Sequence, residues 1–202
     1  MPSIAVFDVG NILLRWDPRN LYQRIFSDVG RMAFFLDHVC TPEWNIEQDR
    51  GRSWADAEAE AIARHPEFTA EIRAYRARWA ETVDGPIAAN VALLETLRRN
   101  GVANYAITNF AADTFAEAQD SFPFLKGFDG VVCSGQEKLC KPGREIFQVL
   151  LDRYRLKAED CLFIDDSAAN IATAAAMGFH TIHYGLGLDA RGAFAQFGFP
   201  VA

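Results

Sequence analysis

The sequence predicts an α/β fold: a Rossmann-like parallel sheet flanked by helices, with a helical cap inserted after the first strand. Two observations lead to this class. Short apolar runs alternate with amphipathic helical segments through the second half of the chain, which favours a parallel sheet covered on both faces. One further strand-like run lies near the start of the chain, separated from the others by a long stretch of helical pattern. We therefore expect a discontinuous α/β core at 1–14 and 88–202, and a helical cap at 15–87.

The first part of the chain supplies one strand and several helices. Residues 3–9 form an apolar run typical of a buried strand, and the turn signal Asp8-Val9-Gly10-Asn11 ends it. The pattern is broken at 15–18 and again at 84–86. Between these breaks, apolar residues recur at helical spacing, except in 41–53, which looks loop-like. The helical segments are 21–26, 30–39, 53–65 and 68–83.

The second part of the chain alternates strictly between helix and strand. Gly101 closes its first helix, and Pro142 suits the first turn of a later one. We expect the Phe-rich tail at 194–201 to pack onto the core. The predicted helices are 86–101, 110–119, 142–155 and 168–178, and the predicted strands are 104–108, 130–134, 161–165 and 180–184.

Composition narrows the class of function. The chain has 202 residues, half of them hydrophobic, so a sizeable core can form. Its 20 basic and 27 acidic residues give a net charge of −7, which argues against nucleic acid or an anionic membrane as the partner. No apolar run approaches the ~18 residues that span a bilayer, and the start of the chain has no leader pattern. Cys40, Cys133, Cys140 and Cys161 form no CxxC pair, as expected for free thiols in a cytoplasmic protein.

Four short polar clusters follow predicted strands or open predicted helices. Asp8, Thr108 and the pair Asp165-Asp166 end strands, and Lys141 precedes a helix. Taken singly, most have a simple structural explanation, such as capping a turn or a helix. The adjacent acids are different, because they would repel one another without a cation. Paired carboxylates suit Mg²⁺, and in parallel sheets ligands bind beyond the carboxyl ends of the strands.

Together these clusters resemble a known family. The segments FDVGN, ITN, KPGREIF and FIDDSAANI resemble the four motifs of the haloacid dehalogenase-like (HAD) hydrolase superfamily. The helical insertion resembles that family's C1-type cap. FDVGN followed by WDPRNLY resembles a phosphatase branch that includes glucose-1-phosphate phosphatase-like proteins. The resemblance implies a Mg²⁺-dependent phosphatase acting on a small phosphorylated metabolite, such as a sugar phosphate or an acyl phosphate, as a monomer or homodimer.

The resemblance also implies a role for each motif residue. Asp8 attacks phosphorus and becomes an aspartyl-phosphate, which water then hydrolyses. Thr108 and Asn109 bind the phosphoryl oxygens, and Lys141 offsets the charge between Asp8 and the phosphate. This division of labour agrees with phosphoryl transfer in general, which depends on positioning and charge neutralisation.

The implied metal site draws on both ends of the sequence. Mg²⁺ is expected to be held by Asp8, Asp166 and the backbone carbonyl of Gly10. Asp165 and Asn170 are expected to support these ligands from behind. Any residue at position 10 supplies a carbonyl, so this site does not depend on the side chain there.

The sequence departs from the family pattern at the residue that usually protonates the leaving group. Most phosphatases of the family carry a second Asp two residues after the nucleophile, where this chain has Gly10. Losing such an acid–base group typically costs ~10²–10⁴-fold in rate. We expect either substrates with good leaving groups, such as acyl or anomeric phosphates, or an acid borrowed from elsewhere. The candidates are Asp17 and Asp49 for the acid, Arg50 for a substrate oxyanion, and Trp44 and Asn45 as further cap residues near the site.

Other functions compete with this hypothesis. A 2-haloacid dehalogenase would use Asp8 on carbon without a metal, although that class usually lacks the acidic pair. A phosphate-accepting receiver module also combines acids, Thr and Lys, but there the acidic pair precedes the acceptor, whereas here Asp165 follows Asp8 by 157 residues. A catalytically weak HAD-fold binding protein is a further alternative because of Gly10.

Overall fold

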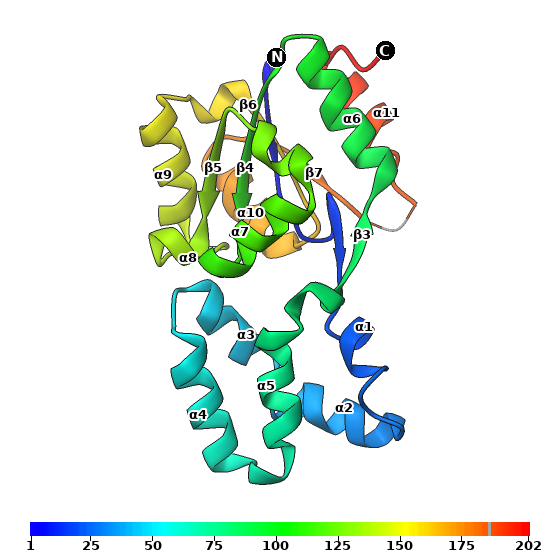
Figure 1. Cartoon of the computed structure of the whole chain (residues 1–202). Helices are drawn as coiled ribbons and strands as arrows, with labels where there is room; N and C mark the ends of the chain where they lie inside the picture. The colour runs from blue at the N-terminus through cyan, green and yellow to red at the C-terminus, as the bar shows by residue number, and fades with distance from the viewer. Residues whose placement is uncertain (186) are drawn as a thin grey trace.

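The core is a five-stranded parallel sheet in the order β5-β4-β1-β6-β7 (Figure 1). The computed structural model describes residues 1–185 and 187–202. Strand β1 lies at the centre, with Ile4 level with Ala103 of β4 and with Cys161 of β6. The strands are β1 (Ile4–Phe7), β4 (Ala103–Thr108), β5 (Gly130–Cys133), β6 (Cys161–Asp165) and β7 (His180–His183).

Helices cover both faces of this sheet, as the sequence predicts. Side chains of β1 alternate between the two faces, so Phe7 joins one apolar cluster and Val6 the other. One face is covered by α6, α7 and α11, and the other by α9 and α10. The bounds are α6 (Ala88–Arg99), α7 (Ala112–Ser121), α8 (Ser134–Glu137), α9 (Arg144–Tyr154), α10 (Ala168–Ala176), α11 (Ala190–Gln196), η3 (Pro123–Gly127) and η4 (Ala158–Asp160).

The Phe-rich tail packs onto the core, which confirms that expectation. Phe194 is fully buried and stacks on Phe7 with ring centroids 5.5 Å apart. The short helices α8 and α11 are not predicted by the sequence pattern. Helix α9 begins at Arg144 with Gly143 as its N-cap, so Pro142 precedes the helix and does not lie in its first turn.

A second, helical body follows β1 and lies beyond the carboxyl ends of the sheet (Figure 1). We call it the insertion; it runs from α1 to η2. It has an apolar core of its own, in which the ring of Tyr22 packs against those of Phe35 and Tyr75 in tilted geometry. Its elements are α1 (Arg19–Tyr22), α2 (Val29–His38), α3 (Pro42–Asp49), α4 (Trp54–Arg64), η1 (Pro66–Phe68), α5 (Thr69–Ala77) and η2 (Trp79–Thr82).

Two features of the insertion correct the sequence reading. The stretch that looks loop-like contains helix α3, which begins after Thr41, whose hydroxyl accepts a hydrogen bond from the Trp44 amide at 3.1 Å. The two predicted breaks instead pair as an antiparallel ribbon of β2 (Leu14–Trp16) and β3 (Val83–Pro86). Glycine and proline in β3 disfavour strand, so only the long-range pairing reveals it.

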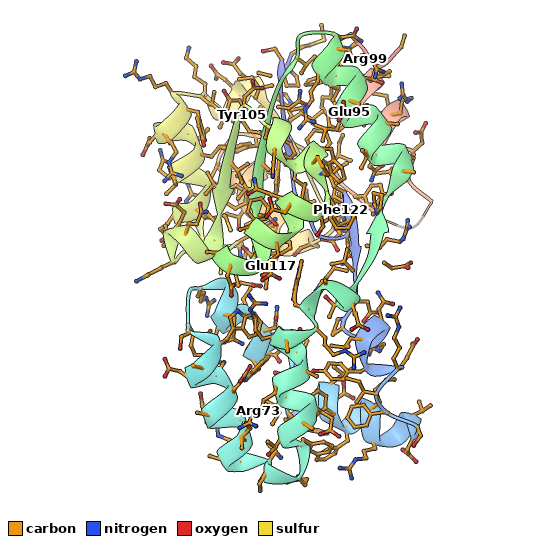
Figure 2. The ribbon with its side chains drawn as sticks, viewed as in Figure 1. Arg73, Glu95, Arg99, Tyr105, Glu117 and Phe122 are labelled. Carbon is orange, nitrogen blue, oxygen red and sulfur yellow. The ribbon has the colours of Figure 1, made fainter. Side chains whose placement is uncertain are left out.

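Polar contacts join the insertion to the core. Arg76 of α5 bonds to Asp113 at 2.9 Å and to Glu117 at 2.6 Å, both on α7. Figure 2 shows Glu117 at the end of the core that faces the insertion. Trp54 donates to Asp113 from its indole nitrogen at 3.2 Å. Within the described residues, no helix combines the length and apolarity that crossing a membrane requires.

Candidate active site

The topology brings three of the predicted site residues to one edge of the sheet. Asp8 directly follows β1, while Thr108 and Asp165 end β4 and β6, the two neighbours of β1. Because all three strands are parallel, their carboxyl ends meet, and the side chains converge from distant parts of the sequence. The apolar runs before each residue are what fold as strands, so the placement follows from the sequence pattern.

Three carboxylates form the centre of the site. Asp8, Asp165 and Asp166 each place an oxygen within 4.8 Å of the others. Asp8 and Asp165 are buried, whereas Asp166 is exposed. Burial raises the pKa of Asp8 to about 7, with Lys141 opposing the rise. Burial and the nearby Asp165 also raise the pKa of Asp166. Gathering these carboxylates is therefore costly without a compensating cation.

Lys141 supplies part of that compensation. Its Nζ lies 2.9 Å from Asp8 Oδ1 and 2.7 Å from Asp165 Oδ2, and its side chain is almost wholly buried. Burial acts to lower the pKa of Lys141, but Asp8 and Asp165 outweigh it and raise the pKa above its ordinary value. When all four groups are ionised, two negative charges stay uncompensated. A divalent cation held by oxygen ligands fits this donor set, and Mg²⁺ prefers such ligands.

Asp165 is held more firmly than its two neighbours. Asn170 Nδ2 donates to both of its oxygens, at 2.9 and 3.0 Å, and the Ser167 amide donates to Oδ1 at 2.8 Å. With Lys141 on Oδ2, little acceptor capacity is left on this carboxylate. Its position suits support of the site, and exposed Asp166 is the member of the pair with lone pairs free for a ligand.

Thr108 carries an unsatisfied hydroxyl. Its Oγ1 is buried and has no hydrogen-bond partner among the described residues. Leaving such a group unpaired costs about 1–3 kcal/mol, so a ligand oxygen at this position would be stabilised. Asn109 behaves differently: its side chain bonds to both the amide and the carbonyl of Lys141, at 2.9 and 3.0 Å. That side chain fixes the backbone that carries the ammonium.

Gly10 leaves open space beside the nucleophile. A Cβ built at this position would meet no atom within 4 Å. Of the two carboxylates suggested as replacement acids, Asp49 lines the same pocket as Gly10, whereas Asp17 lines a different one and accepts from the Arg19 amide at 2.8 Å. Burial raises the pKa of Asp49 to about 7, opposed by the Ala111 amide.

Two other predicted residues lie away from this pocket. Arg50 is exposed at the end of α3, and its guanidinium pairs with Glu47 at 2.6 Å. Trp44 packs within the insertion against Trp54 and Tyr75. The structure therefore does not bring Arg50 together with the acidic cluster.

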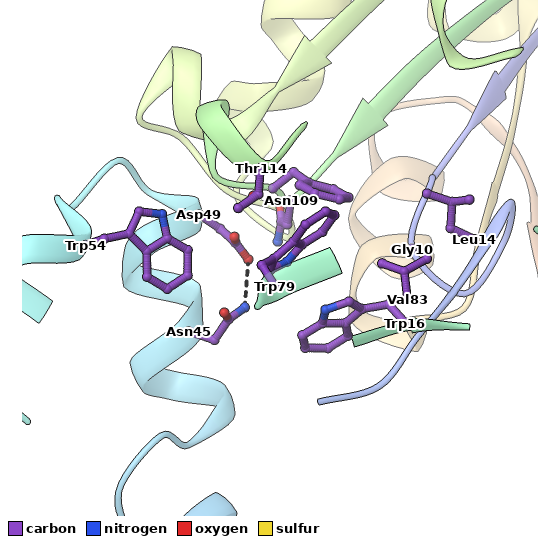
Figure 3. Close-up of a pocket in the computed structure, with 11 residues that line it drawn as sticks. Gly10, Leu14, Trp16, Asn45, Asp49, Trp54, Trp79, Val83, Asn109 and Thr114 are labelled. Atoms are coloured by element: carbon purple, nitrogen blue, oxygen red, sulfur yellow. Dashed lines mark hydrogen bonds between the residues drawn. The ribbon is translucent and has the colours of Figure 1, made fainter. Parts of the chain in front are cut away.

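Four of the eleven residues that line the pocket between the insertion and the core are aromatic. Figure 3 shows Trp16, Trp54 and Trp79 around the carboxylate of Asp49. Sequence reasoning missed these tryptophans, because they come from three segments whose meeting depends on how the insertion folds back. The lining residues are Gly10, Leu14, Trp16, Asn45, Asp49, Trp54, Trp79, Val83, Asn109, Phe110 and Thr114.

Comparison with known proteins agrees with this class of site. The chain belongs to the haloacid dehalogenase-like hydrolases, because the model of that family matches residues 6–178. The matched span begins within β1 and ends after α10, so it contains the whole acidic cluster and Lys141. The family assignment and the parallel sheet confirm the fold class and the superfamily predicted from the sequence motifs.

Individual relatives differ in chemistry. The chain is 26% identical over 179 residues to sesquiterpene phosphatase astK of Aspergillus oryzae, covering 89% of this chain and 88% of that protein. A HAD family enzyme, BT-2542 of Bacteroides thetaiotaomicron, solved with magnesium and inorganic phosphate, has a TM-score of 0.72 at 19% identity, covering 96% of this chain and 100% of that one. L-2-haloacid dehalogenase of Xanthobacter autotrophicus has a TM-score of 0.65 at 15% identity, covering 100% of this chain and 85% of that one.

Proposed function

We propose that this hydrolase is a Mg²⁺-dependent phosphatase that cleaves a small phosphate monoester through an aspartyl-phosphate on Asp8. One observation carries the proposal: three carboxylates converge, and the single buried ammonium that contacts two of them leaves charge that a divalent cation would balance. The unpaired hydroxyl of Thr108 beside them suits a phosphoryl oxygen. The phosphatase named among the relatives supports phosphoester chemistry.

The residues divide the reaction into two displacements. A carboxylate oxygen of Asp8 attacks phosphorus, the bond from phosphorus to the leaving oxygen breaks, and the leaving alcohol takes up a proton. Water then attacks phosphorus, the bond from Asp8 to phosphorus breaks, and inorganic phosphate leaves. Lys141 stays within 2.9 Å of the nucleophile and so offsets charge as the two anions approach. Thr108 donates its free hydroxyl to the phosphoryl group.

Asp8, Asp166 and the carbonyl of Gly10 would hold the Mg²⁺ ion, with Asp165 and Asn170 fixing the ligands from behind. The ion would supply further neutralisation of phosphoryl charge. Asp165 suits the supporting role because its oxygens already accept from Lys141, Asn170 and the Ser167 amide.

The leaving group's proton is assigned to Asp49. This carboxylate lines the pocket beside Gly10, where the usual acid is missing. A pKa of about 7 keeps a substantial fraction protonated at neutral pH, as general acid catalysis requires. Asp17 is the weaker candidate, since it lines another pocket and accepts a hydrogen bond from the Arg19 amide.

A dehalogenase is the second candidate, because one neighbour in fold is a haloacid dehalogenase. Such an enzyme would use Asp8 on carbon and would gain nothing from the charge of Asp166. The three clustered carboxylates therefore favour the phosphatase.

The test is phosphate release from p-nitrophenyl phosphate, with Mg²⁺ and with excess chelator, for wild type and Asp8→Asn. We expect release that needs the metal and is lost in the variant. Asp120→Asn is the matched control, since this exposed Asp lies outside the site and should behave as wild type. Chloride release from 2-chloropropionate in the presence of chelator, without phosphate release under any condition, would establish the dehalogenase instead.

A further inference from the structure

The walls of the pocket beside Gly10 are apolar and aromatic. Six of the eleven lining residues are Leu14, Trp16, Trp54, Trp79, Val83 and Phe110. Within the described part of the chain, none of the lining side chains is cationic. A second phosphate or a carboxylate on the substrate would thus find no counter-charge here.

The polar side chains of the pocket are largely occupied by protein partners. Asn45 donates to Asp49 at 3.3 Å, and Thr114 donates its hydroxyl to the Ala111 carbonyl at 3.2 Å. Asn109 is bound on both sides of its amide by the Lys141 backbone. The Trp54 indole donates to Asp113 at 3.2 Å. A sugar needs many free donors and acceptors for its hydroxyls, and few are left in this pocket.

Two residues that line the pocket, Gly10 and Asn109, lie close in the chain to residues of the reaction site. Gly10 lies two residues after the nucleophile Asp8, and Asn109 follows Thr108, whose free hydroxyl faces the same edge of the sheet. A phosphoryl group seated at Asp8 would therefore leave its ester substituent facing the aromatic walls. Trp16 lines the same pocket as Gly10 (Figure 3).

We propose that the substrate is the phosphate monoester of an apolar alcohol, whose hydrocarbon or aromatic part enters the pocket between the insertion and the core. This inference rests on the proposed phosphatase function and narrows it. The sequence led us to expect a sugar phosphate or an acyl phosphate. We propose instead a substrate that is selected by its apolar tail. Asp49 then protonates an alcohol oxygen that is a poor leaving group on its own.

A series of primary alkyl phosphates tests this selection, because their leaving oxygens are chemically alike. We would measure kcat/KM for ethyl, butyl, hexyl and octyl phosphate, below the concentrations at which they form micelles, beside glycerol phosphate and glucose 6-phosphate. Each methylene that becomes buried should raise kcat/KM by about fourfold. Equal kcat/KM values along the alkyl series, or a higher kcat/KM for glucose 6-phosphate, would overturn this inference. Turnover of acetyl phosphate in the same experiment would show that the phosphatase proposal still holds.

A binding measurement separates the two proposals if turnover is absent. Quenching of tryptophan fluorescence would report octyl phosphate and glucose 6-phosphate binding to Asp8→Asn, since three tryptophans line the pocket. Tighter binding of octyl phosphate with no turnover by wild type would refute the phosphatase and keep the pocket assignment. Tighter binding of the sugar phosphate would refute the assignment.

Variants locate the effect in the pocket. Trp16→Ala should flatten the dependence on chain length, and Trp16→Phe should restore part of it, with thermal unfolding of each variant checking the fold. Phe34→Ala is the matched control, because this aromatic residue of the insertion is 47% exposed and lies outside the pocket lining. If Trp16→Ala folds and its kcat/KM still depends fully on alkyl chain length, the apolar tail does not bind beside Trp16.

Discussion

The two sides of the interface between core and insertion are built differently. On the core side, buried charged groups hold one another at hydrogen-bonding distance, and Asp8, Lys141 and Asp165 form one network. On the side of the insertion, Trp54 and Trp79 line the pocket together with Asn45 and Asp49, whose side chains bond to each other. In the proposed reaction, the core would thus hold the reacting groups, and the insertion would supply much of the wall that contacts the substrate.

The largest effect should follow from removing the ammonium. Lys141→Met would leave Asp8 and Asp165 buried without their cation, and breaking a buried ion pair costs about 3–5 kcal/mol. We expect phosphate release to fall by ~10²–10³-fold, and the free energy of unfolding in chelator to drop by several kcal/mol. Urea unfolding with and without Mg²⁺ measures the second effect, and the metal should recover part of the loss.

Lys126→Met is the control for that prediction, since Lys126 forms an exposed pair with Asp120. Such surface pairs contribute ~0–1 kcal/mol. If Lys141→Met unfolds at the same urea concentration as Lys126→Met, the buried network does not stabilise the core as its geometry indicates.

Restoring the missing acid should have the next largest effect. The open space at Gly10 can accept a side chain, so Gly10→Asp should fold normally. A positioned general acid contributes ~10²–10⁴-fold, and we expect at least a tenfold rise in kcat for butyl phosphate because Asp49 supplies only part of this help. Acetyl phosphate, whose leaving group needs little protonation, should gain less.

Gly10→Asn offers the same shape without a proton to donate. A similar rise in kcat for butyl phosphate in Gly10→Asp and Gly10→Asn would point to packing or hydrogen bonding as the cause. If neither variant changes the rate for butyl phosphate, protonation of the leaving group does not limit the reaction.

Asp49 gives a smaller effect with a defined pH window. As general acid it must be protonated, so kcat for butyl phosphate should fall as pH rises above about 7. Asp49→Asn should lower kcat at pH 6 by about tenfold or more and remove this alkaline limb. An unchanged pH profile in the variant would assign the limb to another group.

The same residue should alter the pH dependence of stability. Because the pKa of Asp49 rises from 3.8 to about 7 on folding, the folded state binds more protons than the unfolded state between these values. Wild-type stability should therefore decline as pH rises from about 4 to 7, and Asp49→Asn should decline less. Between pH 5 and pH 7 the free energy of unfolding should fall by about 2 kcal/mol more in wild type than in Asp49→Asn, measured by urea unfolding in chelator. Asp8 is present in both proteins, so its own titration cancels.

The core side of the interface could be predicted from the sequence, and the reason is geometric. Asp8, Thr108 and Asp165 each follow a short apolar run, and parallel strands bring such ends to one edge of a sheet. Lys141 could be placed only through the family motif, because the turn before α9 has no local signal that aims a side chain at the site.

The pocket wall could not be predicted in this way. Trp16, Trp54 and Trp79 line one pocket but come from the ribbon, from α4 and from η2, and the pairing of β2 with β3 brings the segments of Trp16 and Trp79 together. That pairing joins residues about 70 positions apart, and β3 contains glycine and proline, against local propensity. Arg50 shows the opposite error, because we expected it to bind the substrate. Residues 42–49 fold as helix α3, and Arg50 at the end of this helix pairs with Glu47.

The smallest effect concerns the contacts that join the two sides. Arg76 bonds to Asp113 and Glu117 across the interface, with about half of each carboxylate side chain exposed. Exposed ion pairs contribute ~0.2–1 kcal/mol each, so Arg76→Gln, which removes two of them, should change the free energy of unfolding by less than about 2 kcal/mol. If these pairs hold the insertion over the site, KM for octyl phosphate should rise about two- to fivefold while kcat for acetyl phosphate stays near wild type.

Salt distinguishes this electrostatic role from simple packing. Raising ionic strength should increase the wild-type KM for octyl phosphate toward that of Arg76→Gln, because exposed charges are screened within about 8–10 Å at physiological salt. Arg73→Gln is the matched control on the same helix, since Arg73 has no ion pair among the described residues. Should Arg73→Gln raise KM as much as Arg76→Gln, general loss of positive charge on α5 would explain the change, and the specific pairing with α7 would not hold the insertion in place.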